Sequence, residues 1–129
     1  MRIILILSFL VTLSGCSSNK IKTMPKECNS LKAPKGFTYW KERPTGKEIY
    51  PPVPNKAARD RIEGCAILSF DFDKKGTATN VKILKEYPQG YDLGKLFAIY
   101  MLSNRFKNSA GKSKRAAGFF FSIERKIKH

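Results

Sequence analysis

Apolar and polar residues alternate in the middle of the chain with the period of a β-strand. Within residues 65–73, Leu68 and Phe70 fall on one face, and polar side chains fall mostly on the other. A period of two residues with apolar side chains on one face is typical of a half-buried strand. A turn that ends at Gly76 follows, and residues 77–86 form a second β-rich run. The two runs predict a β-hairpin.

Helical patterns stand on either side of this hairpin. Residues 54–64 form a short alanine-containing run in which Asn55 is placed to cap the start of a helix and Gly64 to end it. In residues 92–106, apolar side chains recur at i, i+3, i+4 and i+7, which is one face of a helix. A last apolar run at 117–124 predicts a third strand. This order predicts an α+β fold with a small three-stranded antiparallel sheet and two helices packed on one face.

The N-terminus has a different pattern. Arg2 precedes a short apolar run over residues 3–11, and the small residues Ser14 and Gly15 stand directly before Cys16. The run is too short for the ~20 apolar residues that a membrane-spanning helix needs. A cysteine directly after the small residues predicts a bacterial lipoprotein signal. The segment resembles a lipobox, which implies that the signal is removed and that Cys16 carries the lipid.

Cleavage at this point predicts a chain in three parts. They are a lipoprotein signal peptide at 1–15, a lipidated tether and aromatic arm at 16–49, and a folded domain at 50–126. The tether begins polar and basic, whereas the arm combines several prolines with aromatic residues such as Trp40 and predicts a short edge strand or a segment lying on the domain. The expected location is the cell envelope, lipid-anchored in the outer membrane and facing the periplasm. Ser17 resembles the residue that follows the lipidated cysteine in proteins sorted to the outer membrane.

Two cysteines remain once Cys16 carries the lipid. Cys28 and Cys65 would lie in an oxidising compartment, where an even pair favours a disulfide. Such a bridge would contribute roughly 4 kcal/mol to stability in the chain-entropy account. The alternative is that Cys65 is a small buried strand residue and Cys28 is a free thiol.

The charge balance is strongly basic. The chain has 25 Lys and Arg against 10 Asp and Glu, a net charge of +15. In the envelope, the polyanions available to such a surface are lipid phosphates, lipopolysaccharide and cell-wall polymers, and binding to them weakens with salt. The candidate basic surface is the loop that carries Lys107, Lys112, Lys114 and Arg115. The alternative is a solvated surface with no specific partner. The chain lacks the aromatic and basic interleaving of an RNA-binding sheet, so nucleic acid is not expected.

The motifs of the folded part together resemble the TonB C-terminal domain family. That family has a short alanine-rich helix, an Ile-Glu-Gly leading into an alternating strand, a glycine turn, an Asn-Val-x-Ile strand, an amphipathic helix and a last strand. The matching residues here are Pro54, Ile62, Glu63, Gly64, Ala66, Leu68, Phe70, Gly76, Asn80, Val81, Ile83, the helix at 93–106 and the strand at 119–123. The likeness covers roughly residues 50–125 and implies the same α+β fold.

The resemblance implies a binding module. In that family the domain takes an extended segment of an outer-membrane receptor as an added strand, with affinity from backbone hydrogen bonds and selectivity from side-chain pockets. The matching element is the last strand, and the expected binding edge consists of Phe119, Phe120, Phe121, Ser122 and Ile123. The implied partner is an outer-membrane receptor or another envelope protein, and a homodimer is left open. The alternative is a structural lipoprotein whose basic surface contacts cell wall or anionic lipid.

Candidate catalytic groups are sparse. His129 is the only histidine and is the last residue of the chain, and there is no Gly-rich phosphate loop. The carboxylates Asp71, Asp73 and Glu86 fall at strand ends beside lysines, where solvation of the hairpin accounts for them. We therefore expect no enzymatic activity, no metal site and no cofactor.

Overall fold

The computed structural model describes residues 24–122. The predicted signal peptide, the lipid attachment at Cys16 and the edge residue Ile123 lie outside the described residues. Within 24–122, no helix is long and apolar enough to cross a membrane. The elements in chain order, with η1 and η2 as 3-10 helices, are η1 (Lys26–Ser30), β1 (Thr38–Tyr39), α1 (Asn55–Arg59), β2 (Gly64–Phe72), β3 (Ala78–Tyr87), α2 (Leu93–Ser103), η2 (Lys107–Ser109) and β4 (Arg115–Phe121).

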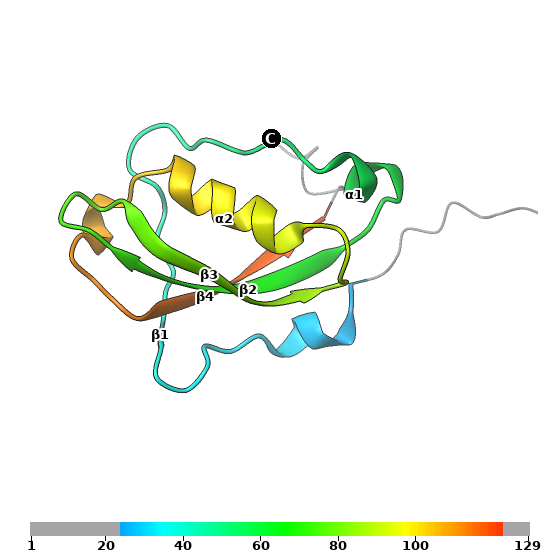
Figure 1. Cartoon of the computed structure of the whole chain (residues 1–129), viewed down its shortest axis with the longest axis horizontal. Helices are drawn as coiled ribbons and strands as arrows, with labels where there is room; N and C mark the ends of the chain where they lie inside the picture. The colour runs from blue at the N-terminus through cyan, green and yellow to red at the C-terminus, as the bar shows by residue number, and fades with distance from the viewer. Residues whose placement is uncertain (1–23, 123–129) are drawn as a thin grey trace, which may run out of the picture.

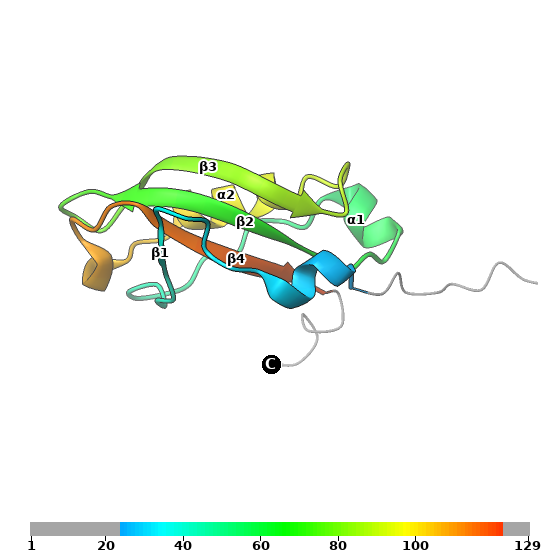
Figure 2. The same cartoon turned by 90° about the horizontal axis from the view of Figure 1, so that it is seen from below.

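The sheet has four strands in the order β1-β4-β2-β3 (Figure 1). β2 pairs antiparallel with β3, as the predicted hairpin requires, and its other side pairs antiparallel with β4. The expectation of three antiparallel strands is nevertheless wrong, because the short β1 adds a fourth strand parallel to β4 and makes the sheet mixed. β1 lies in the aromatic arm, for which a short edge strand was one of the two predicted alternatives, although that strand was not included in the predicted sheet. Figures 1 and 2 show α2 on one face of the sheet and η1 on the opposite face.

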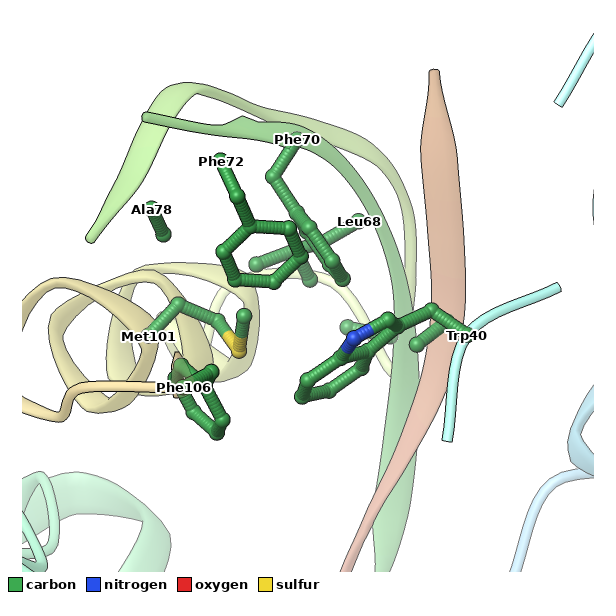
Figure 3. Packing of buried hydrophobic residues seen from close by; sticks show 9 residues of the cluster. Trp40, Leu68, Phe70, Phe72, Ala78, Met101 and Phe106 are labelled. Carbon is green, nitrogen blue, oxygen red and sulfur yellow. The ribbon is translucent and has the colours of Figure 1, made fainter. Parts of the chain in front are cut away.

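The larger core cluster lies between the sheet and α2. Its β2 members are the alternating apolar residues of the predicted strand, and they meet Met101 from α2 and Phe106 from the segment after it (Figure 3). Trp40 lies at the centre of this cluster and is 7% exposed. Its ring makes edge contacts with Phe70 at 5.1 Å and with Phe106 at 5.0 Å, and its indole N–H donates to the buried Ser109 hydroxyl at 2.8 Å. The segment expected to be an arm thus supplies a central core residue.

A second, smaller cluster joins α1 to the start of α2. Ala57 of α1 and the following Ile62 pack with Leu93, Leu96 and Phe121. Both α-helices therefore lie on the same face, as predicted. The predicted first helix is shorter than expected, because α1 ends at Arg59.

Gly64 does not end a helix but begins β2. A Cβ atom at Gly64 would collide with the Tyr87 backbone and the Leu93 side chain, so the absence of a side chain allows close packing here. Asn55 is also not the cap of α1, because Pro54 precedes the helix and no side chain caps it.

The opposite face of the sheet is covered by the N-terminal segment. Cys28 of η1 is bonded to Cys65 of β2, with Cα atoms 5.7 Å apart, so the predicted disulfide is confirmed. Leu31 follows η1 and lies over Gly118 of β4, where a Cβ atom would clash with its side chain. A covalent bond and an apolar contact together hold this segment against the central strands.

Candidate functional site

The outer side of β4 is only partly paired. The Thr38 N–H donates to the Lys114 carbonyl at 2.9 Å, and the Trp40 N–H donates to the Ala116 carbonyl at 2.9 Å. The register of β1 with β4 ends at the pair Tyr39 and Ala116. Beyond Ala116, no strand of the described chain pairs with this side of β4.

The alternation of backbone groups identifies which residues of β4 point outward. Successive residues of a strand direct their N–H and C=O groups to opposite sides. Because the Ala116 carbonyl faces β1, the backbone groups of Gly118 and Phe120 face outward, and those of Phe119 and Phe121 face β2. The unpaired stretch therefore offers N–H donors and carbonyl acceptors at two alternate residues.

The three consecutive phenylalanines divide between the two faces of the sheet. Phe119 and Phe121 pack into the clusters on the α2 side. Phe120 lies on the opposite face, in register with Cys65 of the disulfide, and is 50% exposed. Ser122 follows the strand, and its hydroxyl donates to Glu63 at 3.1 Å.

A pocket of about 340 Å³ lies beside the unpaired stretch, on the α2 face. Its walls come from the end of β4, from α2 and from residues 40–53 that connect β1 to α1. Phe97 of α2 stacks on Phe119 of β4, with ring centroids 5.1 Å apart, and Tyr100 meets Phe119 edge-on at 6.3 Å. A side chain of an added strand would enter this space, because strand side chains alternate between faces.

Glu48 joins two tyrosines at the wall of the pocket. The Tyr100 hydroxyl donates to Glu48. Burial, followed by this hydrogen bond, raises the pKa of Tyr100 far above its ordinary value. Hydrogen bonding to Glu48 likewise raises the pKa of Tyr50, whose ring lies 6.1 Å from that of Tyr100. Both phenols are therefore neutral at physiological pH.

The opposite edge of the sheet, β3, is built differently. The pairing of β2 with β3 shifts register twice, between Ile67 and Leu68 and between Ser69 and Asp71. The first shift leaves Leu84 without an opposite residue, and both shifts add residues to β3. Bulges and lysines are common protections of an exposed strand edge, and β3 also carries Lys82 and Lys85.

The predicted basic residues fall into two places. Lys112, Lys114 and Arg115 lead into β4, whereas Lys107 is in η2 and lines a separate polar hollow. The loop backbone is fixed, because the Phe72 N–H donates to the Lys112 carbonyl at 2.8 Å. The lysine side chains are exposed and the Arg115 side chain is half-buried.

The three carboxylates considered for chemistry each have a structural contact. The Lys114 N–H, and after it the Asn80 amide, lower the pKa of Asp71 by hydrogen bonding to its carboxylate. Asp73 accepts two backbone N–H groups within its own turn. Glu86 accepts the Gly94 N–H at 2.9 Å at the start of α2. Within the described part of the chain, no group of His, Cys, Asp and Glu is arranged to hold a metal ion.

The pocket residues outside β4 were not predicted as a site. Trp40, Glu48 and Tyr50 come from a proline-rich stretch without periodicity. Their one sequence signal is an unusual concentration of aromatic residues between prolines. Tyr100 lies on the apolar stripe of the predicted helix, where core packing was the natural interpretation.

Comparison with known proteins gives one family match. The family model described as the Gram-negative bacterial TonB protein C-terminal matches residues 50–94. The resemblance to the TonB C-terminal family is confirmed. The matched residues include α1, β2, β3 and the first residues of α2, whereas β4 follows them. TonB C-terminal domains are protein-interaction domains of the cell envelope that bind outer-membrane receptors.

A solved structure of the TonB2 protein from Vibrio anguillarum is similar to this chain. The two are 15% identical, and the alignment covers 95% of this chain and 97% of that chain with a TM-score of 0.45. No curated protein matches the chain.

Proposed function

We propose that this chain is a lipid-anchored binding module of the TonB C-terminal type. In this proposal, it takes an extended segment of an outer-membrane transport receptor, or of another envelope protein, as an added strand on the outer edge of β4. The observation that carries the proposal is the unpaired stretch of β4 beyond Ala116, with the outward backbone groups of Gly118 and Phe120.

The position of β1 supports this mode of binding. β1 already pairs with the first part of β4, so an added strand would continue the same line along the edge. Backbone hydrogen bonds at Gly118 and Phe120 would supply affinity, and the pocket beside Phe119 would supply selectivity. The bulged and lysine-bearing β3 is the less suitable edge.

The anchor in this proposal is lipid on Cys16, which holds the domain at the periplasmic face of the outer membrane. Support comes from the lipobox-like residues before Cys16. More than one acyl chain would hold the protein firmly, since a single chain binds only marginally. The intact mass of the protein from the membrane fraction tests this part separately. Cleavage elsewhere, or absence of acyl mass, would overturn it.

A pair of variants at Phe120 tests the edge. Phe120→Pro removes the outward N–H, and proline is tolerated on the open side of an edge strand. Phe120→Ala removes the same ring but keeps the N–H. We expect Phe120→Pro to lose crosslinking to receptor in intact cells, while Phe120→Ala retains most of it. Circular dichroism of both variants verifies the fold.

Equal crosslinking by both folded variants would contradict strand addition. The alternative is contact of the exposed Lys112 and Lys114 with cell wall or anionic lipid. It would be supported if Lys112→Gln with Lys114→Gln abolishes envelope binding and if high salt releases the wild-type protein.

A further inference from the structure

The charged residues that line the pocket are acidic, whereas the chain as a whole is basic. The whole protein has 25 Lys and Arg, yet none of the described residues that line the pocket is basic. Two of its 10 acidic residues, Glu42 and Glu48, line it instead. Both glutamates are half-buried. The pocket is thus a local acidic site on a strongly basic protein.

The rest of the lining is mainly aromatic. Phe97 and Phe119 form a stacked wall, Tyr100 and Tyr50 stand beside Glu48, and Trp40 contributes from the core side. The face of an aromatic ring is electronegative and attracts a cation within about 6 Å. Aromatic walls can contact the apolar stem of a long basic side chain, and nearby carboxylates can pair with its cationic head.

Arg43 carries a positive charge near this site. Arg43 is close enough to Tyr50 and Tyr100 to oppose the rise of their pKa values, but it does not line the pocket. Within residues 24–122, the recorded ion pair is that of Arg59 with Asp60, and Glu48 has none. The Glu48 carboxylate therefore keeps capacity for a cation from a partner.

The geometry of strand addition places a partner side chain at this pocket. On neighbouring strands, side chains on the same face stand about 4.5–5.5 Å apart. The residue of an added strand beside Phe119 or Phe121 would point to the α2 face, where the pocket opens. We infer that this pocket selects a lysine or arginine side chain of the added segment, with its stem on the aromatic wall and its head at Glu48. This inference rests on the proposed strand addition.

Three synthetic peptides test the preference. They are short extended peptides of alternating Thr and Val that differ in one central side chain, which is lysine, acetyl-lysine or norleucine. Trp40 is the single tryptophan of the chain and lines the pocket, so its fluorescence reports occupancy in titrations of the full-length protein in detergent. We expect the lysine peptide to bind about tenfold more tightly than the acetyl-lysine and norleucine peptides.

Two glutamate variants locate the cause of the preference. Glu48→Gln removes the charge but keeps an oxygen that accepts the Tyr100 hydroxyl. It should remove the lysine preference and leave the binding of the norleucine peptide unchanged. Glu63→Gln is the matched control, because Glu63 contacts Ser122 near the same edge but does not line the pocket. It should keep the preference.

The outcomes separate this inference from the proposed function. Equal or tighter binding of the norleucine peptide, or a lysine preference that survives Glu48→Gln, would overturn the cation pocket while leaving strand addition intact. Failure of all three peptides to bind, or lysine-peptide binding unaffected by Phe120→Pro, would overturn both.

Discussion

β3 and the stretch of β4 beyond β1 are the open backbone edges of the sheet, and they differ in construction. β3 is exposed along its length but is interrupted by two register shifts and carries Lys82 and Lys85. β4 is regular in its pairing with β2, is covered by β1 at its start and is open only beyond Ala116. A regular edge is a template for another strand, whereas bulges and charges discourage pairing.

The comparison indicates that an open edge is best suited to pair with one specific added strand when the edge is short and a neighbouring strand fixes where the pairing starts. β1 limits the length of any added strand and defines where it must start. One side chain of such a strand would then enter the pocket on the α2 face. In the described part of the chain, no second strand pairs along the open side of β3.

The largest expected effect follows loss of the residue that fixes β1. Trp40→Ala should destabilise the protein by about 3–5 kcal/mol, because it removes a buried ring at the centre of the core. Exchange of the amides of β1 should rise, while β3 changes little. Denaturant unfolding and hydrogen exchange measure both. Tyr39→Ala is the control at the neighbouring residue, since Tyr39 belongs to β1 but is 56% exposed. Equal losses from the two variants would contradict the role of Trp40.

The disulfide should have the next largest effect. Replacing both Cys28 and Cys65 by serine should lower stability by about 2–5 kcal/mol, because the unfolded chain regains the entropy of the open loop. The segment over the back of β4 should exchange faster than β3. Thermal unfolding of the double variant, beside wild type with and without reductant, measures the change. A reductant effect that persists in the double variant would point to another cause.

Removal of a bulge should convert β3 into an edge more like β4. Deletion of Leu84 restores continuous pairing between the residues opposite Ile67 and Leu68. The straightened edge should associate with itself, giving a mass in light scattering that rises with concentration. Leu84→Ser is the control, because it keeps the bulge and removes the apolar side chain. A deletion variant that stays monomeric at all concentrations would show that the lysines and the second register shift are enough to protect β3.

The smallest effect concerns pH and Asp71, which contacts both edges. Hydrogen bonding holds the pKa of Asp71 below its ordinary value of 3.8. Its contribution to stability is therefore fully present above pH 3.8 and is lost as pH falls through the lowered folded-state pKa. Asp71→Asn should flatten the acid loss of stability and also the rise in exchange of the Lys114 amide, which donates to Asp71. Asp73 also has a lowered pKa, so Asp73→Asn should flatten the acid loss of stability but leave exchange at Lys114 unchanged, because its carboxylate accepts only within its own turn. Acid titration of unfolding, with exchange at Lys114, measures this.

The sequence predicted most of what periodicity can report. The hairpin of β2 and β3, the helix α2 and the last strand follow from repeating apolar positions, and the disulfide follows from the cysteine count and compartment. β1 followed only as one of two alternatives, a short edge strand or a segment lying on the domain, because two residues carry little period and parallel pairing leaves no local turn signal. Gly64 was wrongly predicted to end a helix. A glycine after a helical run can either end the helix or allow close packing of neighbouring groups, and the sequence pattern does not distinguish the two.

The pocket on the α2 face was not predicted for a related reason. It is assembled from β4, α2 and the irregular stretch between Trp40 and Val53, and long-range contacts of irregular backbone leave no spacing rule in the chain. Phe119, Phe120 and Phe121 were predicted as the binding edge because the last strand matches the element that takes an added strand in the TonB C-terminal family. Glu48 and Tyr50 were not predicted as pocket residues, because the pocket forms only when residues far apart in sequence come together.

The bond between Cys28 and Cys65 also has a mechanical consequence. A pull on the chain before Cys28 reaches β2 directly through the covalent bond, so residues between Cys28 and Cys65 bear none of the tension. β2 is the central strand, hydrogen-bonded on both sides to β3 and β4. Tension between that end of the chain and a partner bound along β4 would therefore cross the hydrogen bonds between β2 and β4, which would bear the load together in shear. Trp40 and β1 would not carry this load.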